Sequence, residues 1–296
     1  MRSKVTLILC IDKKNYFFPY IEEEGIVLEE VYKAAKNKLQ YYWIKLFKKL
    51  PHLSRLCYGT WRDHIAEFDK IVILDEAYDP PIQDFLKRYE VPAYLYAWNS
   101  VLNHKTKLYK SIKRTKQIPV YSFDKQDCIK YNLKYNTTMY PGKLADQYTF
   151  QRKCDKQYAL FFVGYDKGRG KKIEDLKRYL DHCSLKHYFK IIDSGERMEY
   201  AEYLTILNDS GAILEVVQEG QSGISMRTME SLFYEKKLVT TNRSVKEYEF
   251  YNPKNMFILG EDSLEKLPQF LKSEYEQVPG EIVEQYDLKQ WVSRFV

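Results

Sequence analysis

The residues best suited to bind an anion lie in a polar loop between an apolar run, residues 212–217, and a helical pattern. Small side chains leave backbone N–H groups accessible, and a helix N-terminus favours negative charge. Arg227 can place a guanidinium beside a phosphate, where two parallel hydrogen bonds are possible. Glu230 lies about one helical turn later and can accept hydrogen bonds from a ribose diol. The loop residues expected to surround the anion are Gln221, Ser222, Gly223 and Ser225.

A second glycine-rich turn, residues 164–172, follows the apolar run 158–163 and opens another helical pattern. It is not a Walker A loop, because five residues separate Gly164 from Gly170 and Lys172 stands where Ser or Thr is required. A dinucleotide fingerprint is excluded too, since the third glycine is missing at its offset. The clustered cations Lys167, Arg169, Lys171 and Lys172 favour phosphate contact by this turn.

Both turns also have a simpler interpretation. The loop before Arg227 could be an ordinary helix start, with Ser225 as its cap and Glu230 as a solvated acid. The turn at 164–172 could be a generic glycine-rich connection between a strand and a helix.

Three carboxylates follow predicted strands in the first half of the chain: Asp12, Asp75 and Glu76. A carboxylate in such a place can take a proton from a hydroxyl as a general base. Acids at strand ends are also common as helix caps and turn formers, so each has a structural alternative. His64 and His104 are isolated, and a lone histidine is more often structural or exposed.

Apolar runs alternate with helical patterns along the chain, which is typical of βαβ units and a parallel sheet covered on both faces. In the first run, residues 4–11, apolar residues occupy both odd- and even-numbered positions, as in a parallel strand that is buried on both faces. We therefore predict an α/β protein of two Rossmann-like, doubly wound parallel-sheet domains, joined by a linker at 141–156. The expected ranges are 1–145, 156–285 and, for a terminal helix, 286–296.

The pattern also places individual elements. A helix is predicted from about 26 to 50, where Pro51 ends it. Further strands are expected at 71–74, 93–97, 120–123, 158–163, 189–192, 212–217, 237–241 and 256–259.

The composition is that of an ordinary globular protein, with 45% hydrophobic and 16% aromatic residues among 296. Disordered chains lack this aromatic content. No run of about 18 uncharged apolar residues appears, which excludes a membrane-spanning helix. The 5 cysteines are scattered without Cys-x-x-Cys spacing, so neither a zinc site nor a disulfide framework is suggested, and a reducing cytoplasm is expected.

Positive charge is concentrated in residues 1–150, which carry 25 Lys/Arg against 17 Asp/Glu. Residues 31–56 hold seven Lys/Arg and no acid, and residues 91–123 hold six and no acid. Such stretches suit an interfacial helix on an anionic leaflet, and they would also suit a nucleic-acid backbone. The alternative is a basic solvated face above a stripe that packs in the core, formed by Leu39, Tyr42, Trp43, Leu46 and Leu50. No nucleic-acid-binding motif is present, so no nucleic acid is expected.

Residues 223–230, with the run Lys-Lys-Leu-Val-Thr-Thr-Asn at 236–242, resemble the donor-binding half of GT-B glycosyltransferases. The likeness is to bacterial enzymes of lipopolysaccharide-core or capsular polysaccharide biosynthesis. In the best-known GT-B families seven residues separate two glutamates, of which the second binds the donor ribose. Glu230 matches the second glutamate and Ser222 replaces the first, while Arg227 replaces the usual proline, a departure from the version associated with retaining transfer. The resemblance also places Gly168, Arg169 and Lys171 near the donor phosphates, because their turn matches the first βα loop of the donor domain.

The resemblance implies transfer of a sugar from a nucleotide-sugar donor to a glycan or lipid-linked acceptor in bacterial cell-surface polysaccharide biosynthesis. The donor would bind the second domain and the acceptor the first, with the active site in a cleft between them and the terminal helix crossing back. No Asp-x-Asp occurs, so neither a metal nor a cofactor is expected, and loop amides with Arg and Lys would stabilise the diphosphate. The expected location is cytoplasmic, peripheral on the inner face of the plasma membrane through the basic first half.

Other activities remain open. A different GT-B enzyme, such as a nucleotide-sugar epimerase or a polyol-phosphate transferase, is one alternative. A non-catalytic scaffold of a polysaccharide assembly complex is another.

Overall fold

The computed structural model describes residues 5–21, 23–47, 50, 53–101, 107–115, 117–147, 156–193 and 195–296. The chain divides into two compact units, one of Met1–Thr137 with Val292–Val296 and one of Thr138–Trp291. The division falls within the range expected for the first domain, so helix α5 (Gly142–Gln147) belongs to the second unit. Of the linker expected at 141–156, residues 148–155 lie outside the described residues, as does His104.

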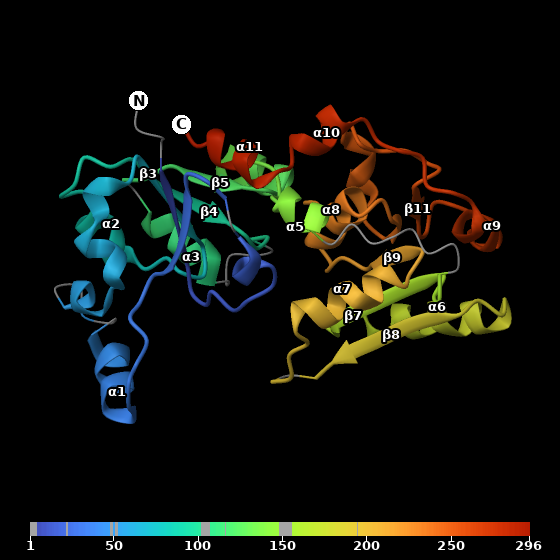
Figure 1. The fold of residues 1–296 in the computed structure, drawn as a ribbon, viewed down its shortest axis with the longest axis horizontal. Helices are drawn as coiled ribbons and strands as arrows, with labels where there is room; N and C mark the ends of the chain where they lie inside the picture. The colour runs from blue at the N-terminus through green and yellow to red at the C-terminus, as the bar shows by residue number, and fades with distance from the viewer. Residues whose placement is uncertain are drawn as a thin grey trace. The chain divides into compact units, whose positions relative to one another are not determined.

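A parallel sheet with strand order β2-β1-β3-β4-β5-β6 forms the centre of the first unit (Figure 1). Ile8 of β1 lies beside Leu28 of β2 on one side and Val72 of β3 on the other. Strands β1 and β4 are buried along their whole length, as their continuous apolar sequences require in a sheet covered on both faces. The strands are β1 (Thr6–Cys10), β2 (Ile26–Glu30), β3 (Lys70–Leu74), β4 (Ala93–Ala97), β5 (Val120–Ser122) and β6 (Lys134–Tyr135).

Helices and short 3-10 turns connect these strands. Asp79 caps α2, where its Oδ1 accepts a hydrogen bond from the Ile82 N–H at 3.0 Å, and Asp124 caps α4 by accepting from the Gln126 N–H at 3.0 Å. The helices are α1 (Lys38–Phe47), α2 (Pro80–Leu86), α3 (Lys107–Arg114) and α4 (Lys125–Tyr131). The 3-10 turns are η1 (Phe18–Tyr20), η2 (Ser54–Cys57), η3 (Thr60–Asp63) and η4 (Ile65–Glu67).

The helix predicted over residues 26–50 is wrong in its first half. Residues Ile26–Glu30 form β2, which pairs with β1, and the helix begins only at Lys38. Ile26 and Val27 are β-branched residues that favour a strand beside the buried β1. The helical spacing of the apolar residues after Lys38 therefore does not extend back to this strand.

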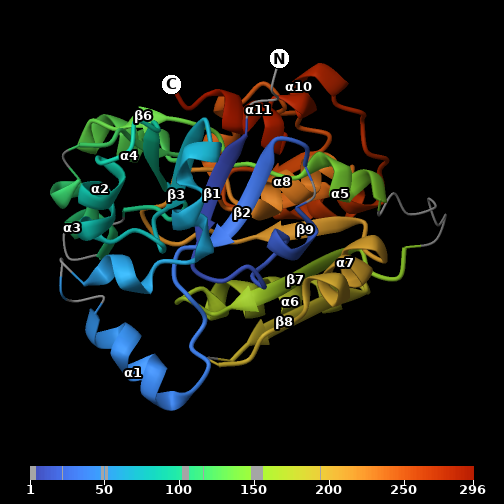
Figure 2. The same cartoon turned by 60° about the vertical axis from the view of Figure 1, so that its left-hand side comes forward.

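The two basic stretches of the first unit differ in their packing. Leu108 and Ile112 of α3 are buried in a cluster with Ala97 and Val101, so this helix has a solvated basic face over the core. No residue of α1 is buried. Figure 2 shows α1 extending away from the sheet of its unit. The core-packed alternative for the stripe at 39–50 is therefore wrong.

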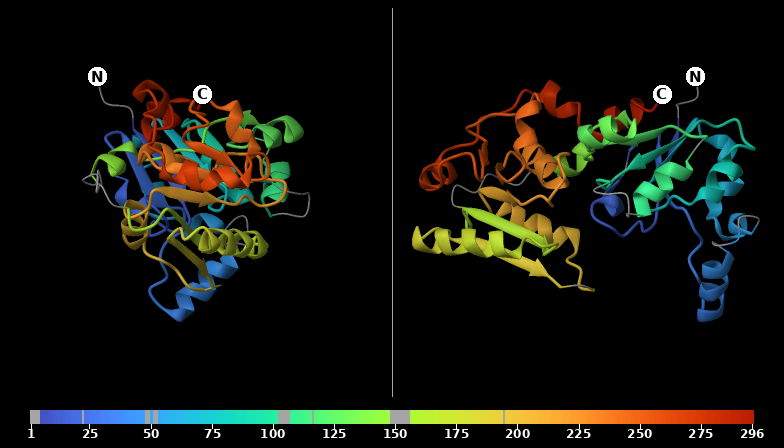
Figure 3. Two further views of the ribbon diagram at one scale, coloured as in Figure 1. Left: turned by 90° about the vertical axis from the view of Figure 1, so that its right-hand side faces the viewer. Right: turned by 180° about the vertical axis from the view of Figure 1, so that it is seen from behind.

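The second unit contains a five-stranded parallel sheet with strand order β11-β10-β9-β7-β8. Phe162 of β7 packs with Ile173, Leu176 and Leu180 of α6, whereas Phe161 contacts the ring of Tyr203 from α7. Because adjacent strand residues point to opposite faces, α6 and α7 cover the two faces of the sheet, as Figure 3 also shows. The strands are β7 (Leu160–Tyr165), β8 (His187–Ile192), β9 (Ala212–Glu215), β10 (Lys237–Thr240) and β11 (Met256–Ile258).

The remaining elements of the chain are helical. They are α6 (Gly170–His182), α7 (Tyr200–Asn208), α8 (Met226–Phe233), η5 (Arg243–Glu247), η6 (Leu264–Lys266), α9 (Leu267–Lys272), α10 (Gly280–Glu284) and α11 (Leu288–Ser293).

The end of the chain belongs to the first unit. The Phe295 ring lies 4.8 Å from that of Tyr121, between ring centroids, and 5.6 Å from that of Tyr94. The Lys70 ammonium donates to the Phe295 carbonyl at 2.8 Å. The last five residues thus pack against a sheet that is made entirely from the first half of the chain.

Candidate functional site

Both sheets change winding direction beside their first strand. In the second unit, β8 lies on one side of β7 and β9 on the other; in the first unit, β2 and β3 flank β1 in the same way. Ligands of doubly wound sheets bind at the carboxyl ends of the strands at such a switch point. The turns singled out from the sequence follow β7 and β9, and the three acids follow β1 and β3.

A buried carboxylate, Glu215, organises the loop after β9. It is the last residue of β9 and is only 1% exposed. Its carboxylate accepts hydrogen bonds from Ser225 Oγ at 2.5 Å, Thr228 Oγ1 at 2.9 Å and Thr240 Oγ1 at 2.5 Å. These hydroxyls come from the loop, α8 and β10, so Glu215 fixes three segments together. Sequence reasoning gave it no role, although an acid at the end of a buried strand was a usable signal.

The N-terminus of α8 is held in place by its loop. Ser225 is the helix cap, which was the simpler alternative for this residue, and its Oγ accepts from the Arg227 N–H at 3.1 Å. The Asn242 amide donates to the Gly223 carbonyl at 3.2 Å. Thr138 Oγ1 donates to the Ile224 carbonyl at 2.7 Å. Gln221 and Ser222 are half-buried beside these anchors. The loop is therefore a fixed turn at a helix N-terminus, where backbone N–H groups favour an anion.

Two guanidinium groups, from the two turns, converge at the end of β7. The Arg227 Cζ lies 5.0 Å from the ring centroid of Phe162, and the Arg169 Cζ lies 5.2 Å from it. Arg227 Nη2 donates to the Val163 carbonyl at 2.6 Å, and Arg169 Nη1 donates to the Val216 carbonyl at 2.5 Å. Arg227 makes no ion pair with another described residue, so the Val163 carbonyl and the Phe162 ring hold this cation in position.

The close approach of these arginines requires the glycine at 164. A Cβ added to Gly164 would lie 2.5 Å from Arg227 Nη2 and 3.4 Å from Arg169 Nη2. Sequence reasoning noted Gly164 only as part of a motif. Its role depends on a neighbour 63 positions later, which no local pattern reveals.

Asp166 organises the rest of the turn after β7. Asp166 Oδ1 accepts from the Gly170 N–H at 2.5 Å, so a carboxylate already occupies the first amide of α6. Gly168 has a positive φ of 79° and is exposed, as is Lys171. Among Gly168, Arg169 and Lys171, only Arg169 is buried and directed to the strand ends.

Glu230 lies inside a cluster of tyrosine side chains. Its two carboxylate oxygens accept hydrogen bonds from the hydroxyls of Tyr200, at 2.9 Å, and Tyr203, at 2.5 Å. The Tyr140 hydroxyl connects to those of Tyr200, at 2.8 Å, and Tyr234, at 3.0 Å. Burial raises the pKa of Glu230 to about 7, despite these hydrogen bonds and the charge of Arg227.

The alternative that Glu230 is a solvated acid is therefore wrong, since its side chain is 3% exposed. A ribose contact by this carboxylate stays a prediction. Both of its oxygens already accept from tyrosines, so a bound ribose would share or replace those hydrogen bonds.

In the first unit, Asp12, Asp75 and Glu76 line one small depression, together with Asn15 and Trp98 among others. Asp75 is buried and accepts from the Trp98 N–H at 3.1 Å and the Asn99 amide at 3.2 Å. Burial raises the pKa of Asp75 to about 6, with a smaller contribution from the charge of Glu76. A carboxylate with this pKa is suited to general-base chemistry near neutral pH.

The other two acids differ from Asp75. Asp12 Oδ1 accepts from the Lys14 N–H at 2.8 Å, which is the turn-forming arrangement given as its alternative. Glu76 is exposed, and its Oε1 accepts from the Asn99 amide at 3.5 Å.

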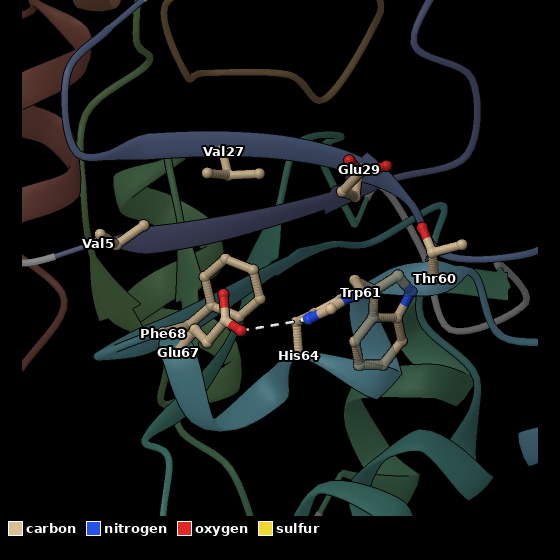
Figure 4. A pocket seen from close by; sticks show the side chains of 8 residues that line it. All are labelled: Val5, Val27, Glu29, Thr60, Trp61, His64, Glu67 and Phe68. Carbon is tan, nitrogen blue, oxygen red and sulfur yellow. Dashed lines mark hydrogen bonds and ion pairs between the residues drawn. The ribbon is translucent and has the colours of Figure 1, made fainter.

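A larger cavity of about 380 Å³ in the first unit contains none of these acids. Figure 4 shows that His64 and Glu67 face each other at its edge, where the Nδ1 to Oε1 distance is 3.2 Å. Trp61 lies beside them but is almost fully buried. His64 thus has an ordinary structural partner.

Neither a metal cluster nor a membrane span is found among the described residues. No three His, Cys, Asp or Glu side chains there are grouped to hold an ion, and no helix there is long and apolar enough to cross a membrane. Among the described residues, Cys10, Cys57, Cys128 and Cys183 form no disulfide, and Cys154 lies outside the described residues.

No known protein family and no curated protein match this sequence. Solved structures do match it. An alpha-glucosyltransferase in complex with UDP and a 13-mer DNA containing a central A:G mismatch is similar with a TM-score of 0.57 and 10% identity, over 91% of this chain and 89% of that chain. An alpha-glucosyltransferase (AGT) in complex with UDP is similar with a TM-score of 0.54 and 8% identity, over 98% of both chains. The chain has the GT-B fold. The fold class predicted from the sequence, two Rossmann-like parallel-sheet domains, is thereby confirmed.

Proposed function

We propose that this chain is a glycosyltransferase and that its second unit binds a nucleotide-sugar donor through the diphosphate. The convergence of Arg169 and Arg227 beside Gly164, at the carboxyl ends of β7 and β9, is the observation that carries the proposal. Two structures of the same fold contain UDP, which supports a uridine nucleotide as the first candidate.

The chemistry of these groups suits a leaving diphosphate. As the glycosidic bond to the donor breaks, negative charge grows on the diphosphate oxygens. Two guanidinium groups and the N-terminus of α8 are positioned before the reaction, so they stabilise this charge without rearrangement. The backbone amides of Gly223 and Ser225 would bind the same group, and Gln221 and Ser222 would line its edge. We propose that Gly168 and Lys171 contribute at the exposed rim and that Glu230 binds the ribose.

In the first unit, Asp75 is the best candidate for the base that deprotonates the acceptor hydroxyl. It combines burial, a raised pKa and a place at the switch point of the sheet. Asp12 and Glu76, in the same depression, are proposed to contribute to acceptor binding.

We propose a glycan or lipid-linked acceptor of bacterial surface polysaccharide synthesis, such as the lipopolysaccharide core or a capsule. The excess of positive charge in residues 1–150 supports an anionic acceptor or surface, and hence work at the inner face of the plasma membrane.

The donor site is tested by calorimetric titration of the full chain with UDP, GDP, CDP, ADP and dTDP. We expect one of these nucleotides to bind, and the Arg227→Gln variant to lose at least about tenfold in affinity, since a hydrogen bond to a charged group contributes about 1.5–3 kcal/mol. Lys177→Gln is the matched control, because the Lys177 side chain lies on α6, is 44% exposed and pairs with Glu174.

The opposite results are equally informative. If Arg227→Gln binds the nucleotide as tightly as wild type, the diphosphate does not bind at the arginines. If no nucleotide binds a folded wild type, the chain is not a transferase of this kind, and a non-catalytic scaffold becomes the better explanation.

A further inference from the structure

Helix α1 carries a stripe of large apolar side chains that face solvent. Leu39, Tyr42, Trp43 and Leu46 are spaced three and four residues apart, so they share one side of the helix. Leu39 is 68% exposed, Tyr42 65%, and Trp43 and Leu46 49% each. Soluble surfaces rarely keep so many large apolar groups together without a partner.

A different side of α1 attaches the helix to its unit. Gln40, Ile44 and Phe47 are half-buried and lie on that second side. The Cys57 thiol, from η2, donates to the Ile44 carbonyl at 3.8 Å. The exposed stripe therefore lies on a different side of the helix from the residues that pack against the unit. The helix keeps those packing contacts while the stripe faces solvent.

Positive charge accompanies the stripe. Lys38 and Lys45 are exposed on a third side of α1, next to the stripe, and Lys33 and Lys36 precede the helix. Residues 31–56 contain seven Lys/Arg and no acid. Apolar and aromatic side chains flanked by lysines are the combination that binds at the interface of an anionic bilayer.

We propose that α1 docks on an anionic lipid bilayer, with Leu39, Trp43 and Leu46 inserted among the acyl chains and Lys38 and Lys45 at the lipid phosphates. This inference rests on the proposed function in one respect, because it names the surface at which that enzyme would meet a lipid-linked acceptor. The binding itself requires no donor and is measured without one.

The stripe favours lipid over the other possible occupants. A nucleic-acid backbone attracts lysines but offers no apolar environment for Leu39 and Leu46. A second copy of this helix would bring its own lysines against Lys38 and Lys45, with no acid in the stretch to neutralise them.

The test is sedimentation of the full chain with vesicles of phosphatidylcholine alone and of phosphatidylcholine mixed with phosphatidylglycerol. We expect binding to the anionic vesicles and little to the neutral ones. Trp43→Ser with Leu46→Ser should weaken binding by more than tenfold. Lys38→Gln with Lys45→Gln should weaken it by about 30-fold, because each lysine near an anionic surface contributes about 1 kcal/mol.

Two matched controls use residues that are exposed but lie off the stripe. Lys110→Gln with Lys113→Gln removes the same charge from α3, whose apolar residues are buried, and should change vesicle binding less than threefold. Tyr41→Ser removes an exposed aromatic ring from another side of α1 and should also change vesicle binding less than threefold.

Several outcomes would overturn the inference. The first is absence of binding to anionic vesicles. The second is a loss of vesicle binding in the Lys110 and Lys113 variant that equals the loss in the Lys38 and Lys45 variant. The third is binding to a short DNA duplex that the Trp43 and Leu46 variant retains. A dimer that the same variant converts to a monomer, without vesicle binding, would assign the stripe to self-association. Titration of UDP separates the two proposals, since the α1 variants should bind it as wild type does.

Discussion

Replacing Gly164 with alanine tests whether the two arginines form a phosphate site. The new Cβ would lie 2.5 Å from Arg227 Nη2 and 3.4 Å from Arg169 Nη2. Ordinary contacts between heavy atoms are about 3.5–4 Å, so the Arg227 guanidinium must move by about 1 Å. Gly164 is not among the residues with a positive φ, and the end of an arginine side chain is flexible, so the strand itself tolerates the methyl group.

The expected effect falls on ligand binding. The displaced guanidinium loses its 2.6 Å hydrogen bond to the Val163 carbonyl and its place beside the diphosphate. Hydrogen bonds to charged groups contribute about 1.5–3 kcal/mol, which corresponds to roughly a 10- to 150-fold weaker affinity for UDP. The melting temperature should change little, because alanine in a strand is favoured over glycine by about 0.5–1 kcal/mol and offsets part of the lost hydrogen bond.

The assay is calorimetric titration of UDP into wild type, Gly164→Ala, Arg227→Gln and the double variant. If alanine acts by moving Arg227, the double variant should bind no more weakly than Arg227→Gln alone. Gly280→Ala is the control, since nothing lies within 4 Å of a Cβ added there. An unchanged dissociation constant for Gly164→Ala, or fully additive losses in the double variant, would refute the reasoning.

Three further predictions concern buried carboxylates. Asp75→Asn should lower kcat by roughly 100- to 10,000-fold while the UDP dissociation constant stays unchanged, and the wild-type rate should fall as pH drops below about 6; an equal loss of UDP affinity would contradict a role as base. Glu215→Ala should lower the free energy of unfolding by about 3 kcal/mol in urea titrations, because three hydroxyls lose a charged acceptor, and a loss below about 1 kcal/mol would show that water replaces it. Burial raises the pKa of Glu230 from 4.5 to about 7, so its contribution to stability is complete below about pH 4.5 and is lost as pH rises through 7. Between about pH 5 and pH 8 the free energy of unfolding of wild type should fall by about 2–3 kcal/mol more than that of Glu230→Gln, and parallel pH profiles would exclude this effect.

The parts of the site that are encoded by residues close together in the sequence could be predicted. Apolar runs followed by glycine, serine and a helical pattern identify strand ends, and parallel strands bring those ends to one edge of a sheet. The cap at Ser225 and the nearby Arg227 could be predicted in this way, since both are encoded within a few residues of the helix start.

Other features depend on neighbours that are distant in sequence. The alternative of a solvated acid stayed open for Glu230 because nothing nearby in the sequence shows that Tyr200 and Tyr203 of α7 cover it. The stripe on α1 has the spacing of a core-facing helix, and spacing alone does not distinguish a face that packs from one that is exposed. Only the packing of the attached side, around Ile44, shows that the stripe is the unpartnered one.

The aromatic contacts of Phe295 have a consequence for synthesis of the protein. The first unit needs residues Val292–Val296 to complete its packing, although its sheet is encoded by the first half of the chain. The ribosome therefore releases all residues of the second unit before the first unit can acquire Phe295 and its contact with Tyr121. Domains generally fold in order from the N-terminus during synthesis. Here the unit that emerges first is the last to be finished, and until then Tyr94 and Tyr121 lack the Phe295 ring that packs against both of them.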